Sequence, residues 1–164
     1  MQRFNDPRDW FFEKRFGMFI HWGIYAIPAW HEQVLWRSDI TRTDYEKLIS
    51  EFNPVKFNPE QWLDVLQDAG MEYLCFTAKH HDGFCMWDTT YTDYNIMNTP
   101  YKKDILAKLA KACHKRGVNL GIYYSLPDWH HPNCPNWSRH HEMFGPRAED
   151  DPDEMKYLEY VRNQ

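Results

Sequence analysis

Short apolar runs alternate along the chain with segments whose apolar residues recur at helical spacing. The apolar runs predict buried strands at residues 17–23, 72–77 and 118–124. The helical spacing predicts helices at residues 44–52, 59–69, 104–116 and 153–162. The order strand, helices, strand, helix, strand, helix is typical of right-handed βαβ units, so the sequence predicts an α/β fold with a parallel sheet.

Capping residues mark the ends of three predicted helices. Thr43 and Glu46 have the spacing of a capping box at the start of the first helix. Asn58, followed by proline, is placed to cap the start of the second. Gly117 directly follows the third, where glycine commonly adopts the left-handed conformation that ends a helix.

Three βα units can begin either a doubly wound sheet or a (β/α)₈ barrel. No Gly-x-Gly-x-x-Gly motif follows the first predicted strand, which argues against a dinucleotide-binding sheet. A complete barrel takes roughly 250 residues, whereas the sequence has 164. We therefore predict that residues 1–164 are the N-terminal portion of a single TIM (β/α)₈ catalytic domain, with about the first three βα units, truncated before strand 4.

Charge and hydropathy argue against two classes of partner. The net charge of −5 is spread along the sequence without a basic stripe, so we expect no nucleic-acid partner. No apolar run approaches the ~20 residues of a membrane span, so we expect no membrane contact. The N-terminal residues lack the apolar core of a signal peptide, which predicts a cytoplasmic location for the sequence as written.

Aromatic residues make up 17% of the sequence, a high share that suits a carbohydrate site. Sugars present apolar C–H faces that stack on aromatic rings, while their hydroxyls need hydrogen-bond donors and acceptors. Ordinary core packing accounts for aromatic residues equally well. The composition by itself leaves both interpretations open.

Polar residues occur at the carboxyl end of each predicted strand. His21 ends the first, His80 and His81 follow the second, and Tyr123 and Tyr124 end the third. Enzymes with parallel sheets place their sites at this end. A single histidine in a strand is more commonly a hydrogen-bonded core residue, but the repetition over three strands predicts a site.

The polar stretch at residues 79–83 cannot continue a buried strand and is expected to face solvent or a ligand. Within it, Asp82 fits either a loop-stabilising turn or a ligand contact. Four further histidines, at positions 130, 131, 140 and 141, raise the alternative of a metal site. The sequence has no His-Glu-x-x-His or comparable ligand spacing, so we expect no metal and no cofactor, and histidines that donate hydrogen bonds to hydroxyls.

Several stretches of the sequence together carry a specific pattern of aromatic, histidine and acidic residues. They are Arg-Phe-Gly-Met-Phe-Ile-His-Trp-Gly-Ile-Tyr at residues 15–25, Pro-Ala at 28–29, Thr-Ala-Lys-His-His-Asp-Gly-Phe-Cys-Met-Trp-Asp at 77–88, Tyr-Thr-Asp-Tyr-Asn at 91–95, and Tyr-Tyr-Ser at 123–125 with Asp128 and Trp129. In their order and spacing the sequence resembles the α-L-fucosidases of glycoside hydrolase family 29, from about Trp10 to the C-terminus.

The resemblance implies a retaining hydrolase that removes terminal α-linked L-fucose from a fucosylated glycan or fucoside. It implies that His21, His80 and His81 hold fucose hydroxyls and that a tyrosine after the third strand lines the pocket. Tyr124 is the preferred tyrosine, and Tyr123 is the alternative.

A Glu-Trp pair that contacts the sugar in the family is interrupted in this sequence, where residues 31–37 read His-Glu-Gln-Val-Leu-Trp-Arg. Glu32 is the expected equivalent of the glutamate. Trp36 or Trp30 stands in for the tryptophan.

The resemblance places both catalytic carboxylates beyond Gln164. The family's nucleophile is an aspartate at the end of strand 4, and its acid/base lies further along. The residues assigned here are therefore substrate-binding ones, and the chain is expected to be inactive without the missing barrel half, or another chain, to cover its open sheet edges. The alternatives are a non-catalytic fucose-binding or vestigial protein and a metal-dependent hydrolase.

Overall fold

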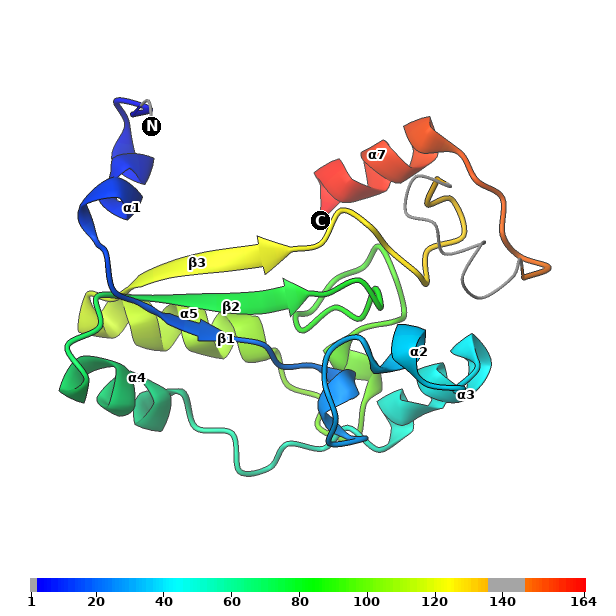
Figure 1. Cartoon of the computed structure of the whole chain (residues 1–164), viewed down its shortest axis with the longest axis horizontal. Coiled ribbons are helices and arrows are strands. Elements are labelled where there is room, and N and C mark those ends of the chain that lie inside the picture. The colour runs from blue at the N-terminus through cyan, green and yellow to red at the C-terminus, as the bar shows by residue number, and fades with distance from the viewer. Residues whose placement is uncertain (1–2, 136–146) are drawn as a thin grey trace.

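The computed structural model describes residues 3–135 and 147–164 and contains a three-stranded parallel sheet (Figure 1). The strands lie in the order β1-β2-β3, with bounds Met18–Ile20, Tyr73–Lys79 and Asn119–Tyr124. Phe19 pairs with Cys75, which in turn pairs with Gly121. The predicted order of strands and their parallel arrangement are confirmed.

Helices of very different length precede, connect and follow the strands. They are η1 Pro7–Asp9, α1 Trp10–Glu13, η2 Ile24–Ala26, α2 Val34–Arg37, α3 Arg42–Glu46, η3 Lys47–Ser50, α4 Pro59–Asp68, η4 Ile96–Asn98, α5 Ile105–Arg116 and α7 Glu154–Asn163. The predicted helix at residues 44–52 is therefore split into α3 and η3. No helix in the described ranges is long and apolar enough to cross a membrane.

The helix ends agree with the predicted capping residues in two cases and differ in one. The Asn58 side chain accepts from the backbone N–H of Glu60 at the start of α4, and Gly117 ends α5 in the left-handed region at φ 65°. At α3 the cap is Thr41, whose hydroxyl oxygen accepts from the N–H of Asp44. The predicted capping box at Thr43 is wrong because the helix already begins at Arg42.

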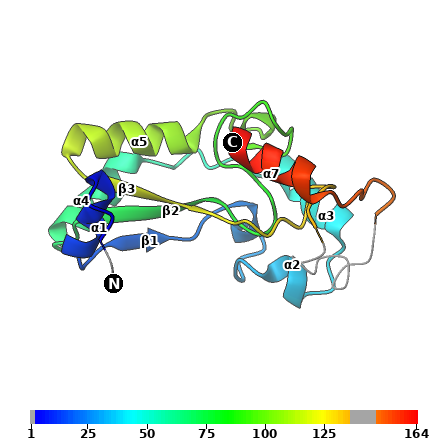
Figure 2. The ribbon, with the colours of Figure 1, turned by 90° about the horizontal axis from the view of Figure 1, so that it is seen from above.

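The core lies between the sheet and the helices α4 and α5. Figure 2 shows α5 along one face of the sheet, where Leu74 and Phe76 of β2 are completely buried. Side chains alternate between the faces of a strand, so Phe19, Cys75 and Gly121 lie on the other face.

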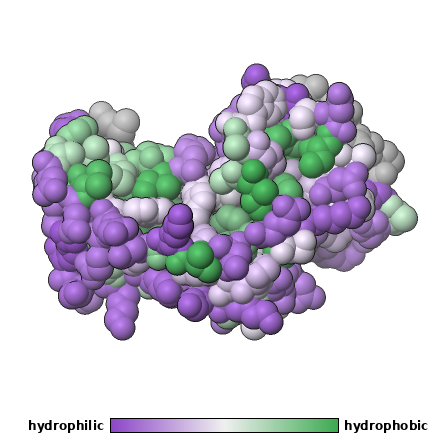
Figure 3. All heavy atoms as spheres, turned by 90° about the horizontal axis from the view of Figure 1, so that it is seen from below, coloured by the Kyte–Doolittle hydropathy of each residue, from purple (hydrophilic) through white to green (hydrophobic). Residues whose placement is uncertain are grey.

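That other face, the open face, carries Phe19 at its β1 edge, where its ring is 51% exposed. At the amino end of the sheet Trp10 and Phe11 pack on the ring of Tyr73, at centroid distances of 5.5 and 5.9 Å. Seen from below, the molecule is hollowed between two lobes, with apolar side chains in and beside the hollow (Figure 3). Much of the open face thus lies uncovered by the described part of the chain.

Strand β2 extends two residues further than predicted, to Lys79. The pairing with β3 is irregular between Thr77 and Lys79. The side chain of Lys79 is completely buried, because its ammonium group forms a 2.7 Å ion pair with Asp128, itself 1% exposed. The expectation that this residue faces solvent or ligand is therefore wrong.

Candidate functional site

The carboxyl ends of β1 and β2 bring three histidines together. The ring of His80 lies 5.6 Å from that of His21 and 4.5 Å from that of His81, measured between centroids. His21 is exposed and stacks on Phe19 at 4.8 Å, whereas His80 is only 5% exposed. Within this cluster the exposure to solvent falls from His21, which is exposed, through His81, which is half-buried, to His80, which is buried.

The two tyrosines at the end of β3 lie on different sides of the strand. Tyr123 stacks on His80 at 5.7 Å and lies 6.2 Å from His21. Tyr124 instead lies under the ammonium group of Lys79, at 4.6 Å, and 6.2 Å from the ring of Trp87. The structure therefore groups Tyr123 with the histidines, and this placement does not fit the preference for Tyr124 as the tyrosine lining the pocket.

The buried His80 and the half-buried His81 are both neutral at pH 7. Burial is the largest cause that lowers the pKa of His80 to about 4, and nearby His81 and His21 lower it further. Burial also lowers the pKa of His81, as does Lys79, while a hydrogen bond to the Pro127 carbonyl opposes the shift. A neutral imidazole carries one donor and one acceptor nitrogen, which suits it to a sugar hydroxyl.

Glu32 lies close enough to the cluster to couple to it electrostatically. A hydrogen bond from its own backbone N–H is the largest cause that lowers the pKa of the Glu32 carboxyl. His21, His31 and His80 lower it further, and the Nδ1 atom of His31 lies 3.8 Å from its Oε2. The Glu32 carboxyl is therefore favoured in its ionised form, with His31 as its neighbour.

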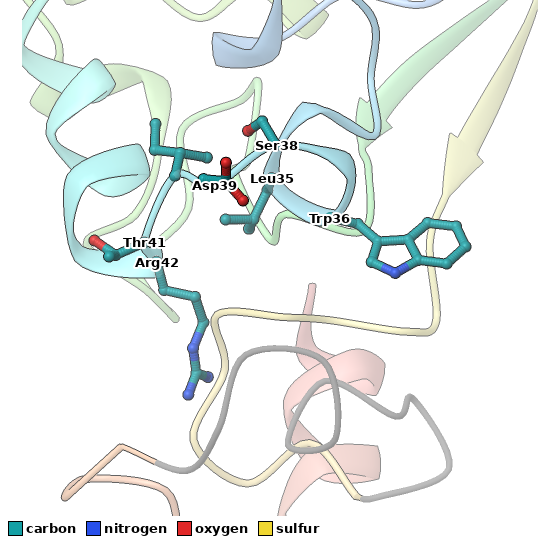
Figure 4. Close-up of a pocket in the computed structure, with 7 residues that line it drawn as sticks. Leu35, Trp36, Ser38, Asp39, Thr41 and Arg42 are labelled. Carbon is teal, nitrogen blue, oxygen red and sulfur yellow. The ribbon is translucent and has the colours of Figure 1, made fainter.

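The two candidate tryptophans occupy different positions. Trp36 on α2 is 47% exposed, lines a pocket with residues of the α2–α3 connection, and has the Arg37 guanidinium over its ring. Its ring is directed away from the other labelled side chains of that pocket (Figure 4). Trp30 packs on His31, next to Glu32, with 4.2 Å between the ring centroids. Trp30 therefore packs against the same histidine whose Nδ1 atom lies 3.8 Å from the Glu32 carboxylate.

Comparison with known proteins identifies the family. The family model for α-L-fucosidase matches residues 2–164. The chain belongs to the α-L-fucosidase family. The tissue α-L-fucosidase of Rattus norvegicus is 35% identical over 77% of this chain and 31% of its own length, and that of Homo sapiens is 34% identical over 75% and 30%.

Solved α-L-fucosidases share the fold of the chain. Isoenzyme 1 of Paenibacillus thiaminolyticus is 42% identical with a TM-score of 0.85, over 96% of this chain and 38% of that protein. The enzyme AlfC of Lactobacillus casei, with bound α-L-fucose product, is 30% identical with a TM-score of 0.81, over 95% and 55%. The chain thus spans about a third to a half of these enzymes, and about 30% of its curated relatives.

Behind the histidines lies a buried layer of charged side chains. Burial would raise the pKa of Asp128, but Lys79 holds it at about 2. The Asp128 carboxylate also accepts from the backbone N–H groups of His130 and His131, at 2.9 and 2.8 Å. It thereby ties the loop after β3 to the end of β2.

Asp82 stabilises the loop after β2. Its carboxylate accepts from the Tyr45 hydroxyl at 2.6 Å and from the backbone N–H of Phe84 at 3.2 Å. Burial raises its pKa to about 6. The structure thus gives Asp82 the turn-stabilising role, one of its two predicted alternatives.

The remaining histidines have other neighbours. His130 bonds to Glu46 at 2.7 Å, and His131 packs on Tyr160 at 4.1 Å, while positions 140 and 141 lie outside the described residues. In the described ranges no three His, Cys, Asp or Glu side chains are grouped to hold a metal ion. Ser125, the last residue of the Tyr-Tyr-Ser stretch, was given no role from the sequence, yet its hydroxyl lies 2.5 Å from His81.

Proposed function

We propose that the chain supplies the fucose-binding part of a retaining α-L-fucosidase that acts on terminal α-linked L-fucose. The observation that carries the proposal is the cluster of His21, His80, His81 and Tyr123 at the carboxyl end of the sheet. Solved relatives support it, because the Bacteroides thetaiotaomicron enzyme was trapped as a covalent intermediate with 2-fluoro-fucosyl fluoride. A covalent intermediate is the mark of a retaining glycosidase.

The chemistry of the cluster suits a deoxysugar. Neutral His80 and His81 each offer a donor or an acceptor to a hydroxyl, and Glu32 accepts hydrogen bonds as an anion. The rings of Tyr123 and His21 offer apolar surface to the C–H groups and the methyl group of fucose. Each hydroxyl left unpaired on binding would cost about 1–3 kcal/mol, which gives the site its selectivity.

The proposal includes the architecture of the complete site. Residues 1–164 form the first three βα units of a (β/α)₈ barrel, and the rest of the barrel pairs with β1 and β3 and covers Phe19. Within residues 3–135 and 147–164 both sheet edges are unpaired and Phe19 on the open face is 51% exposed, and a closed barrel buries such surfaces. The covering segment belongs either to a continuation of this polypeptide or to another chain.

Catalysis then depends on that covering segment. A retaining glycosidase needs two carboxyl groups about 5–5.5 Å apart across the scissile bond. In the part of the chain that the structure describes, the carboxylates of Asp82 and Asp128 are at most 3% exposed and accept from the Tyr45 hydroxyl and the Lys79 ammonium group, so neither is open to a glycosidic bond. We therefore assign binding to this chain and bond cleavage to the covering segment.

The test is a fusion that joins residues 1–164 to the part of the Paenibacillus thiaminolyticus enzyme that follows its matched segment. We expect the fusion to release nitrophenol from 4-nitrophenyl α-L-fucoside, and residues 1–164 alone to release none. A fusion that unfolds cooperatively on heating but stays inactive would contradict the proposal. If that inactive fusion still binds fucose, the chain is a non-catalytic fucose-binding protein instead.

A further inference from the structure

The ring of His81 is held in place by a series of hydrogen bonds that runs through Ser125 to the carbonyl of Pro127. Its Nδ1 atom lies 2.5 Å from the hydroxyl oxygen of Ser125, and that hydroxyl donates to the carbonyl of Pro127 at 2.7 Å. Ser125 is 3% exposed, and its backbone N–H donates to the carbonyl of Lys79 at the end of β2. The serine is therefore fixed by the sheet and shielded from water.

The direction of these hydrogen bonds follows from the last acceptor, the Pro127 carbonyl. A carbonyl oxygen can only accept, so the single proton of the Ser125 hydroxyl points to Pro127. The serine oxygen then faces His81 with its lone pairs, and the contact requires a proton on Nδ1 of His81. In a neutral imidazole the second nitrogen, Nε2, is then an acceptor.

His80 shows the opposite arrangement. Its side chain is 5% exposed, and its Nδ1 is buried without a hydrogen-bond partner in the described part of the chain. A buried N–H without an acceptor is rarer in proteins than an unpaired acceptor. The proton of neutral His80 therefore belongs on Nε2, which makes that atom a donor.

We propose that Ser125 is a positioning residue that fixes His81 as the Nδ1–H tautomer, so that His81 and His80 present an acceptor and a donor nitrogen, respectively, to the ligand. Such a pair fits a hydroxyl, or two adjacent hydroxyls, that both donates and accepts. From the sequence we expected both histidines to donate hydrogen bonds to hydroxyls. In this proposal His80 donates and His81 accepts. Only the identity of the ligand, fucose, rests on the proposed function.

Nitrogen-15 NMR of the chain at pH 7, labelled at histidine, tests the tautomers directly. We expect His81 protonated at Nδ1 and bare at Nε2, and His80 the reverse, before any ligand is added. A His81 ring protonated at Nε2 would overturn the proposal. Added α-L-fucose should shift the His81 Nε2 signal; if the tautomers are as expected but fucose shifts nothing, the tautomer assignment stands and the proposed function fails.

Variants separate the role of Ser125 from simple packing. In Ser125→Ala we expect the ratio of the two His81 tautomers to move roughly fivefold toward Nε2–H, the effect of one lost hydrogen bond. Ser125→Thr, which keeps the hydroxyl, should restore the original tautomer. The matched control is Ser50→Ala, since the Ser50 hydroxyl also donates to a backbone carbonyl, that of Lys47. An unchanged tautomer ratio in folded Ser125→Ala would overturn the positioning role.

Discussion

Replacing the buried lysine behind the histidines is expected to destabilise the chain strongly. In Lys79→Met the ammonium group that lies 2.7 Å from Asp128 is lost, and both side chains are at most 1% exposed. Removing one partner of a buried pair leaves an uncompensated charge and costs about 3–5 kcal/mol. With a urea m-value of ~2 kcal/mol/M, the unfolding midpoint should fall by about 1.5–2.5 M.

An exposed pair provides the matched control. Lys47 lies 2.6 Å from Asp44, but the two side chains are 68% and 56% exposed. Lys47→Met should therefore leave the unfolding midpoint almost unchanged, because solvent-exposed ion pairs contribute little to stability. Equal losses in the two variants, measured by urea unfolding with tryptophan fluorescence, would refute the assignment of Lys79–Asp128 as a buried pair that ties the site together.

The acid limb of the stability curve gives a second readout of the same pair. The pKa of Asp128 is held at about 2, below its ordinary value of 3.8. Its contribution to stability is therefore present above pH 3.8 and is lost as the pH falls from 3.8 toward 2. In Lys79→Met this part of the pH dependence should disappear, and a wild-type acid limb in that variant would contradict the stated cause of the shift.

Four further results are expected. In the fusion, His80→Ala and His81→Ala should each weaken fucose binding by about 1–3 kcal/mol in calorimetry, and an unchanged affinity would count against their role. His80 should titrate near pH 4 in histidine proton NMR, and a midpoint near 6.5 would show that burial does not control it. Asn58→Ala should lower the free energy of unfolding by about 1 kcal/mol through loss of the α4 cap; no loss in thermal unfolding would refute that cap. A chelator should leave the activity of the fusion unchanged, and lost activity would favour a metal-dependent hydrolase.

The strands and long helices were predictable because their signals are local. Apolar runs and helical periodicity gave three parallel strands and the positions of α4, α5 and α7, and Asn58 and Gly117 end their helices as predicted. The end of β2 was not predictable, because the burial of Lys79 depends on Asp128, a residue 49 positions further along the chain. Sequence polarity alone cannot show that a charged residue has a buried partner.

The sequence predicted which strand ends carry the candidate site, but not which way the side chains at those ends point. The histidines were expected at strand ends and do meet there. Tyr123 and Tyr124 are neighbours in sequence, so the choice between them depends on which face of β3 each occupies, and the irregular pairing near Lys79 obscures that alternation. Ser125 was missed because its contact with His81 joins two loops that are distant in sequence.

The most direct test of the central claim is a titration of the 164-residue chain with the two enantiomers of fucose, followed by NMR of histidine and tyrosine side chains. We predict that L-fucose shifts the signals of His21, His80, His81 and Tyr123, and that D-fucose at the same millimolar concentrations does not. His114, in the last turn of α5 at the amino end of the sheet, serves as an internal comparison. Equal responses to both enantiomers, or no response of the four residues to L-fucose, would contradict the account.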